Sequence, residues 1–78
     1  MTLEILSPQG KLFSGEIHLV SVPGTKGAFE IMDRHAPIVS TLEKGQIKVI
    51  DNNGEQKTFD VNTGIVEVKD NKTIILIS

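Results

Sequence analysis

The amino-acid sequence predicts an all-β fold, a small antiparallel β-sandwich of about eight to ten short strands. Apolar and polar residues alternate over short segments, and Gly, Pro, Asn and Asp interrupt these segments at intervals of roughly 6–12 residues. No segment keeps the apolar period of an amphipathic helix over three turns. The chain has 78 residues, so we expect a single domain that spans residues 1–78.

The first half of the chain is predicted to contain four strands, at residues 3–5, 11–13, 16–22 and 27–32. Residues 7–10, Ser-Pro-Gln-Gly, form a turn after the first strand, because Pro and Gly favour turn geometries. Ser14 and Gly15 are expected to separate the second strand from the third, and Pro23-Gly24 is expected to end the third.

The second half is predicted to contain strands at residues 46–50, 57–61, 65–69 and 72–77. Asn53-Gly54 gives the strongest hairpin signal, because both residues tolerate the positive φ angles of tight turns. Asp70-Asn71 predicts a second hairpin. Residues 36–42 are the one stretch expected to hold a helical turn, and Pro37 limits where that turn can begin.

Two of the predicted strands are apolar on both faces. At residues 74–77, positions 74 and 76 face one way while 75 and 77 face the other. In the strand at 16–22, Val20 and Val22 share one face and Leu19 lies on the opposite one. Either the same chain covers both faces, or one face packs in the core while the other contacts a partner.

Composition excludes several classes of function. The chain has no Cys, so it forms neither a disulfide nor a thiolate metal site. A net charge of −2 and the absence of Tyr and Trp argue against nucleic-acid binding, which needs cationic and stacking side chains. The sequence has no apolar run near the roughly 20 residues of a membrane span, and residues 1–7 do not have the pattern of a signal peptide. We therefore expect a soluble, cytoplasmic-type protein.

Two short segments are candidates for binding or catalysis. Residues 24–27, Gly-Thr-Lys-Gly, resemble a phosphate-binding loop but have only part of its pattern, which favours a plain turn. Asp33 could orient His35 in a small hydrolase, although no nucleophile signature accompanies them. His18 and His35 lie far apart and do not predict a zinc site. We predict no catalytic residue, no cofactor and no metal.

The stretch from residue 20 to 41 resembles the epsilon subunit family of F-type ATP synthases. Members of that family typically carry a Pro-Gly-x-x-Gly turn, a short strand and then Gly-His-Ala-Pro followed by two apolar residues. The corresponding segments here are residues 23–27, Pro-Gly-Thr-Lys-Gly, and residues 35–39, His-Ala-Pro-Ile-Val. Residues 3–15, 42–45 and 64–68 resemble the family's opening strand, a turn and a late strand. The resemblance therefore covers essentially the whole chain.

Some positions depart from the family pattern. Arg34 replaces the Gly that usually precedes the His, and Asp33 replaces a Pro. Ala28 and Glu30 stand where Glu and Gly are frequent, so both loops differ in charge. Full members continue into two C-terminal helices, which can restrain ATP hydrolysis and in some members bind ATP. The sequence here ends at Ser78, where the sandwich ends, so the resemblance implies either a natural short form or a fragment without these helices.

The resemblance implies a non-catalytic rotor subunit of the central stalk in a proton-translocating ATP synthase. Such a subunit couples rotation of the membrane ring to the gamma subunit, as a peripheral part of the complex at the cytoplasmic face of the bacterial plasma membrane. The ring contact is implied at Gly24, Thr25, Lys26, Gly27, Ala28, Met32, Asp33, Arg34, His35, Ala36 and Pro37. For gamma we predict outward apolar residues such as Leu19. The alternative is a stand-alone β-sandwich that binds a ligand or a protein.

Overall fold

The computed structural model describes all 78 residues and contains eight strands and no helix. No helix that could cross a membrane is present. The strands are β1 (Thr2–Ser7), β2 (Gly10–Val22), β3 (Phe29–Met32), β4 (Ile38–Leu42), β5 (Gly45–Asp51), β6 (Gln56–Val61), β7 (Gly64–Lys69) and β8 (Lys72–Ile77). The predicted all-β class and the number of strands are confirmed.

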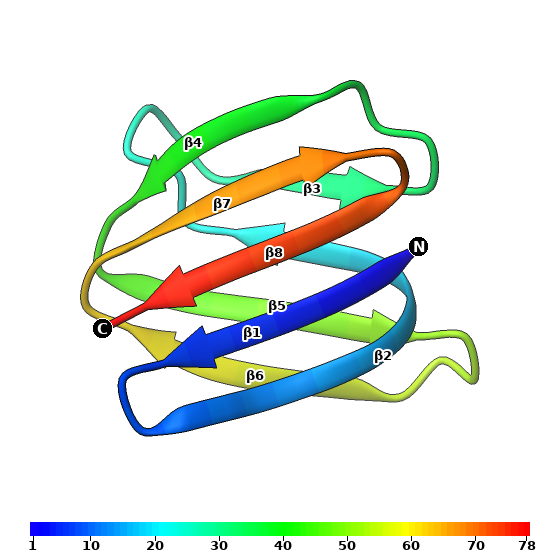
Figure 1. The fold of residues 1–78 in the computed structure, drawn as a ribbon, viewed down its shortest axis with the longest axis horizontal. Coiled ribbons are helices and arrows are strands. Elements are labelled where there is room, and N and C mark those ends of the chain that lie inside the picture. Colours follow the sequence, from blue (N-terminus) through cyan, green and yellow to red (C-terminus); the bar gives the residue numbers. More distant parts are fainter.

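The strands form two layers that share the long strand β2 (Figure 1). The front sheet has the order β4-β7-β8-β1 and continues into the first half of β2, and the back sheet has the order β3-β2-β5-β6. The β1–β8 pair is parallel, with Thr2 opposite Lys72 and Leu6 opposite Leu76, whereas every other pair is antiparallel. The parallel pair brings the first and last strands together in the middle of the front sheet.

The expected break at Ser14-Gly15 is wrong, because β2 runs without interruption for 13 residues. Gly15 still pairs with Leu3 of β1, and from Ile17 onwards the strand pairs with β5 instead. The small residues therefore mark the place where β2 passes from the front sheet to the back sheet. Ile17 and Val20 are both fully buried although they lie three positions apart, which the register shift just after Ile17 permits.

The helical turn expected within residues 36–42 is also wrong, because most of this stretch forms β4. Ile38, Val39 and Thr41 are β-branched, which favours extended backbone. All five residues of β4 pair with β7, from Ile38 opposite Val68 to Leu42 opposite Gly64. Sheet pairing to a distant strand decides the conformation here.

Both predicted hairpins are confirmed. Between β5 and β6, Gly54 has a φ of 84°, and the Asp51 carboxylate accepts hydrogen bonds from the N–H groups of Asn53 (2.8 Å) and Glu55 (3.0 Å). Between β7 and β8, Asp70 and Asn71 have φ angles of 53° and 59°. Two consecutive positive φ angles fit the tight turn that matches the twist of a two-residue hairpin.

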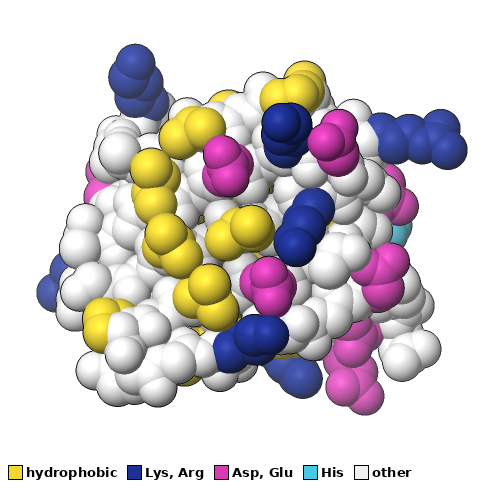
Figure 2. Space-filling view, viewed as in Figure 1, with side chains coloured by type: hydrophobic (Ala, Val, Ile, Leu, Met, Phe, Trp, Pro, Cys, Tyr) yellow, Lys and Arg dark blue, Asp and Glu magenta, His cyan; other side chains and the backbone are white.

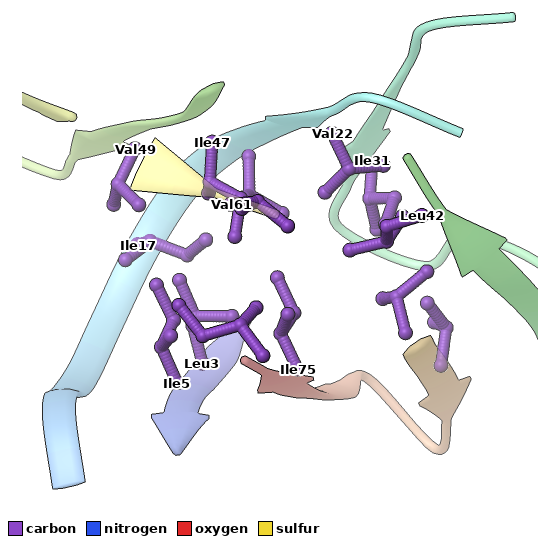
Figure 3. Close-up of a cluster of buried hydrophobic side chains, with 14 of the residues drawn as sticks. Leu3, Ile5, Ile17, Val22, Ile31, Leu42, Ile47, Val49, Val61 and Ile75 are labelled. Atoms are coloured by element: carbon purple, nitrogen blue, oxygen red, sulfur yellow. The ribbon is translucent and has the colours of Figure 1, made fainter. Parts of the chain in front are cut away.

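The core lies between the two sheets (Figure 3). Leu3, Ile5 and Ile75 project from the front sheet toward Ile17 and Ile47 of the back sheet. The whole cluster comprises Met1, Leu3, Ile5, Ile17, Val20, Val22, Ile31, Leu42, Ile47, Val49, Val61, Val66, Val68, Ile75 and Ile77. It draws on all eight strands, so both layers pack on a single core.

Candidate interaction surface

The loop at residues 24–28 is hydrogen-bonded to the end of β4. The Thr25 N–H donates to the Thr41 carbonyl (3.0 Å), and the hydroxyls of the two threonines lie 2.8 Å apart. The Glu43 N–H donates to the Pro23 carbonyl (2.8 Å). A Cβ on Gly24 would lie only 2.7 Å from the Gly27 carbonyl oxygen, so the turn requires glycine at this position. The loop therefore has a fixed conformation. It follows β2 of the back sheet, and its hydrogen bonds hold it against β4 of the front sheet.

The loop at residues 33–37 is fixed in a similar way. The Arg34 N–H donates to the Asn71 side-chain oxygen (2.8 Å), and Arg34 has a φ of 64° in the left-handed region. Asp33 accepts a hydrogen bond of 2.7 Å from the α-ammonium of Met1, and this hydrogen bond, together with the ammonium charge, lowers the pKa of the Asp33 carboxyl. This loop is tied to the β7–β8 turn and to the start of β1.

The two loops lie at opposite ends of one edge of the molecule. Residues 24–28 precede β3, and residues 33–37 connect β3 to β4 (Figure 1). Strands β3 and β4 each have a single neighbour in their sheets and border this edge. The eleven residues of the expected ring contact therefore form two clusters separated by the length of a short strand, with Lys26 and Arg34 at opposite ends.

Asp33 and His35 do not form a catalytic pair. Asp33 bonds to the Met1 ammonium, while Nδ1 of His35 lies 2.7 Å from the carbonyl oxygen of Ala36. Both side chains instead help to shape the loop. The phosphate-loop interpretation of residues 24–27 also lacks support, because no helix follows the loop to direct its N–H groups at an anion.

A surface that the sequence analysis did not assemble covers the outer face of the front sheet. We call it the apolar face: Leu6, Val39, Ile65, Ile74 and Leu76. Ile65 lies opposite Leu76, which lies opposite Leu6, so these three residues form a row across β7, β8 and β1. Val39 is 61% exposed and Leu76 is 48% exposed. Figure 2 shows hydrophobic side chains gathered on this side of the molecule.

The two-sided pattern at residues 74–77 revealed part of the apolar face. Ile75 and Ile77 are buried, whereas Leu76 is exposed, as the alternation predicts. The pattern could not reveal Val39, because a helical turn was expected there. It also could not show that residue 6 lies beside residue 76, since this depends on the parallel β1–β8 pairing.

Charged side chains border the apolar face (Figure 2). Glu4 of β1 forms ion pairs with Lys11 (3.2 Å) and Lys72 (3.7 Å). The hydrogen bond and charge of Lys11, with a smaller contribution from Lys72, hold the pKa of the Glu4 carboxyl below its ordinary value. Glu67 lies between Val39 and Ile74 in the cross-strand row.

Leu19, the predicted gamma contact, is half-buried and belongs to the back sheet. It pairs with Met32 of β3 on one side and Ile50 of β5 on the other. Side chains directly opposite each other on neighbouring strands share a face, so these three residues form a small apolar patch on the outside of the back sheet. Met32 also belongs to the expected ring contact, and it is 48% exposed.

A two-layer sandwich with two hydrogen-bonded loops on one edge and exposed apolar residues on its outer faces has the form of a protein-interaction domain. The family described as "ATP synthase, Delta/Epsilon chain, beta-sandwich domain" matches residues 1–78. The chain belongs to this family.

Curated relatives agree with the assignment. The chain is 39% identical over 75 residues to the ATP synthase epsilon chain of Chlorobaculum tepidum, and the matched residues cover 96% of this chain and 85% of the relative. It is 38% identical to the ATP synthase epsilon chain of Chlorobium limicola, with 95% of this chain and 84% of the relative covered. For Campylobacter hominis the identity is 40%, and the chain spans 58% of that epsilon chain.

Solved structures support the fold. A chain of the Euglena gracilis mitochondrial ATP synthase superposes with a TM-score of 0.90 at 17% identity, covering 96% of this chain and 48% of that one. A chain in the central stalk and c-ring structure of the Tetrahymena thermophila mitochondrial ATP synthase gives 0.83 at 16% identity, covering 99% and 62%. The predicted β-sandwich is thus confirmed by two independent structures.

Family membership confirms the resemblance seen in the sequence. The chain is a non-catalytic, epsilon-type rotor subunit of an ATP synthase, a membrane-associated complex. A stand-alone binding module is not favoured. The individual contact residues remain predictions.

Proposed function

We propose that this chain couples rotation of the membrane ring to the gamma subunit at the cytoplasmic face of a bacterial plasma membrane. The observation that carries this proposal is the arrangement of the exposed surfaces. Two loops of fixed conformation share one edge of the sandwich, and the apolar face borders the same edge through Val39 of β4. One rigid body can then contact two partners at once.

The proposed ring contact is the edge that carries both loops, at residues 24–28 and 32–37. Backbone hydrogen bonds hold the first loop on β4, and the Asn71 side chain holds the second. A preformed loop loses little conformational entropy on binding, so such a contact resists torque without a large ordering cost. Lys26 and Arg34 are exposed at the two ends and are suited to polar or acidic loops of the ring.

The proposed gamma contact is an outward apolar surface, and the fold offers two. Leu19 with Met32 and Ile50 forms the smaller patch on the back sheet. The apolar face of the front sheet has more exposed large apolar side chains and is favoured, because exposed apolar clusters with charged borders are typical of protein-binding sites. The two surfaces lie on opposite sides of the sandwich, so substitutions separate them.

Binding to purified gamma subunit, measured by titration calorimetry, tests the gamma contact. We expect Leu76→Glu to weaken binding at least about tenfold, because it places a charge in the centre of the apolar contact. Leu19→Glu should change binding less than about threefold if the front sheet is the contact, and the reverse order would assign gamma to the back sheet. A folded wild-type chain that binds neither gamma nor the ring would refute the proposed function.

Pull-down with detergent-solubilised ring in the presence of gamma tests the ring contact. Lys26→Glu and Arg34→Glu should each lower the recovered complex while leaving the thermal midpoint close to wild type, because both side chains are exposed. Lys57→Glu is the control, since it makes the same change in charge at an exposed position of β6, away from both loops. Equal losses in all three variants would point to net charge instead of a local contact.

A further inference from the structure

The edge strand β4 is only partly paired on the side away from β7. Gly24 lies opposite Leu42 in an isolated bridge, whose two hydrogen bonds join Thr25 to Thr41 and Glu43 to Pro23. The chain then turns away, as the Gly27 N–H bonds back to the Gly24 carbonyl (2.9 Å). The rest of this side of β4 therefore has no neighbouring strand.

The alternation of hydrogen bonds along β4 identifies the free groups. The Thr41 carbonyl points away from β7, since it accepts the Thr25 N–H. In an antiparallel strand the N–H and C=O of alternate residues point to the same side, so those of Val39 also point away from β7. None of the backbone hydrogen bonds outside the strand ladders involves Val39. Val39 thus presents one free donor and one free acceptor at the open edge.

A groove runs beside this open edge. It has a volume of about 660 Å³ and lies between β4 and the loop at residues 24–28. We call it the β4 groove. Half-buried Phe29 and Ile38 contribute apolar surface to it, and exposed Lys26 stands at its rim. Lys26 forms no ion pair within the chain, so its charge is available to an acidic group of a partner.

We infer that the β4 groove receives an extended segment of a ring subunit, which pairs with Val39 as an added β-strand. Strand addition uses main-chain hydrogen bonds for affinity and alternate side chains for selectivity. The segment would carry an apolar residue toward Phe29 and Ile38 and an acidic residue toward Lys26. The inference rests on the proposed ring contact, because Lys26 and its neighbours in the loop border both surfaces.

Two substitutions at one position separate backbone pairing from side-chain contact. Val39→Pro removes the outward N–H and spares the bonds from β4 to β7, which come from residues 38, 40 and 42. Val39→Thr keeps the N–H and the β-branched shape. Because Val39 also belongs to the apolar face, ring binding is measured on chains already saturated with gamma, and Val39→Pro should bind the detergent-solubilised ring roughly tenfold or more weakly than Val39→Thr. The comparison requires that both variants have thermal midpoints close to that of the wild type. If proline unfolds the domain, a synthetic chain that carries an ester in place of the backbone N–H of residue 39 replaces Val39→Pro.

Hydrogen exchange measured by mass spectrometry on the wild-type chain provides the second readout. The peptide covering residues 38–42 should exchange more slowly with gamma and the ring together than with gamma alone, while the exposed β5–β6 hairpin at residues 52–55 should not change. Ring binding without this protection, and with Val39→Pro equal to Val39→Thr, would overturn strand addition but leave the ring contact standing. Protection that is as large with gamma alone as with gamma and the ring together would overturn the assignment to the ring. Failure of the wild-type chain to bind the ring at all would refute the ring contact and the strand addition together.

Discussion

At the scale of single residues, the close approach of backbone segments decides which positions accept a side chain. Gly24 lies where the loop of residues 24–28 folds against β3 and β4, and a Cβ there would meet both the Gly27 carbonyl oxygen (2.7 Å) and the Phe29 ring (2.9 Å). Gly15, where the sequence predicted a break between strands, has room for a side chain, because a Cβ there would meet only the Phe13 ring at 3.8 Å. The two glycines therefore have different physical roles.

Gly24→Ala should lower the free energy of unfolding by about 1–3 kcal/mol, because the added methyl group forces the loop or the Phe29 ring to move. Gly15→Ala is the matched control and should change stability by less than about 0.5 kcal/mol. Urea unfolding followed by circular dichroism measures both. An equal loss in the two variants would mean that glycine matters in these places for reasons other than the space around its Cα. Because residues 24–28 belong to the proposed ring contact, Gly24→Ala should also weaken ring binding.

At the scale of strands, local pattern predicts pairs that are close in sequence and fails for pairs that are distant. Gly54 in one hairpin and Asp70-Asn71 in the other adopt positive φ angles, so the backbone preferences of the turn residues themselves specify these hairpins. The helical turn predicted within residues 36–42 is wrong because the pairing of β4 with β7, some 26 residues later along the chain, cannot be read from the local sequence, although the β-branched residues of β4 favour a strand. The parallel β1–β8 pair joins the two ends of the chain and is invisible to periodicity for the same reason.

The candidate surfaces also divide into a part that the local sequence predicts and a part that depends on how distant strands pair. The loop residues at 24–28 and 32–37 could be proposed from the family resemblance alone, but their position at opposite ends of one edge depends on how β3 and β4 are placed. The apolar face required the registers of four strands, from Val39 on β4 to Leu6 on β1. Sequence periodicity shows that a strand has two apolar faces, and only the sheet shows which residues of other strands lie beside them.

The ion pairs of Glu4 join three strands, since Glu4 lies on β1, Lys11 on β2 and Lys72 on β8. They lower the Glu4 pKa from the ordinary value of 4.5, so the folded state binds this proton less tightly than the unfolded chain does. The stabilisation is fully present above the unfolded pKa and is lost as the pH falls through the lowered folded pKa. Glu4→Gln should thus be less stable than wild type at neutral pH, and the difference should vanish in acid.

Denaturant unfolding across this pH range measures the difference between wild type and Glu4→Gln. The side chains of Lys11 and Lys72 are exposed to solvent, so added salt should also shrink the effect at neutral pH. Glu55→Gln in the β5–β6 hairpin is the control, because that carboxylate has no ion-pair partner. A difference that persists unchanged in strong acid would show that the substitution acts through packing and not through charge.

At the scale of the whole molecule, a small body must serve two partners. The accessible surface of the chain is 4780 Å². A specific interface covers roughly 800 Å² on each partner, so two such interfaces would occupy about a third of this surface. The ring edge and the apolar face are adjacent through Val39, and any load applied at one is carried to the other by β4 and its neighbours. Transmission of torque then depends on the close packing of one shared core.

The shared core leads to a prediction about folding. β2 belongs to both sheets, and the fifteen buried hydrophobic residues form one cluster, so we propose that residues 1–78 unfold as a single domain. Ile75→Ala, at a fully buried position between the sheets, should lower the free energy of unfolding by about 2–5 kcal/mol. Leu76→Ala, the exposed neighbour on the same strand, should cost less than about 1 kcal/mol.

Calorimetry with intrinsic phenylalanine fluorescence and far-ultraviolet circular dichroism follows the transition. In a single domain the probes coincide and the calorimetric enthalpy equals the van't Hoff enthalpy, for wild type and for Leu76→Ala. Two separated transitions would mean that the front and back sheets unfold independently, and the proposed coupling of the ring edge to the apolar face through one rigid core would fail with them.

Because a domain of this size has a modest reserve of stability, Ile75→Ala should also show whether that rigidity is needed for assembly. At a temperature where the variant remains folded, we expect it to bind gamma and the ring within about threefold of wild type, since Ile75 contacts neither partner and acts only through the core.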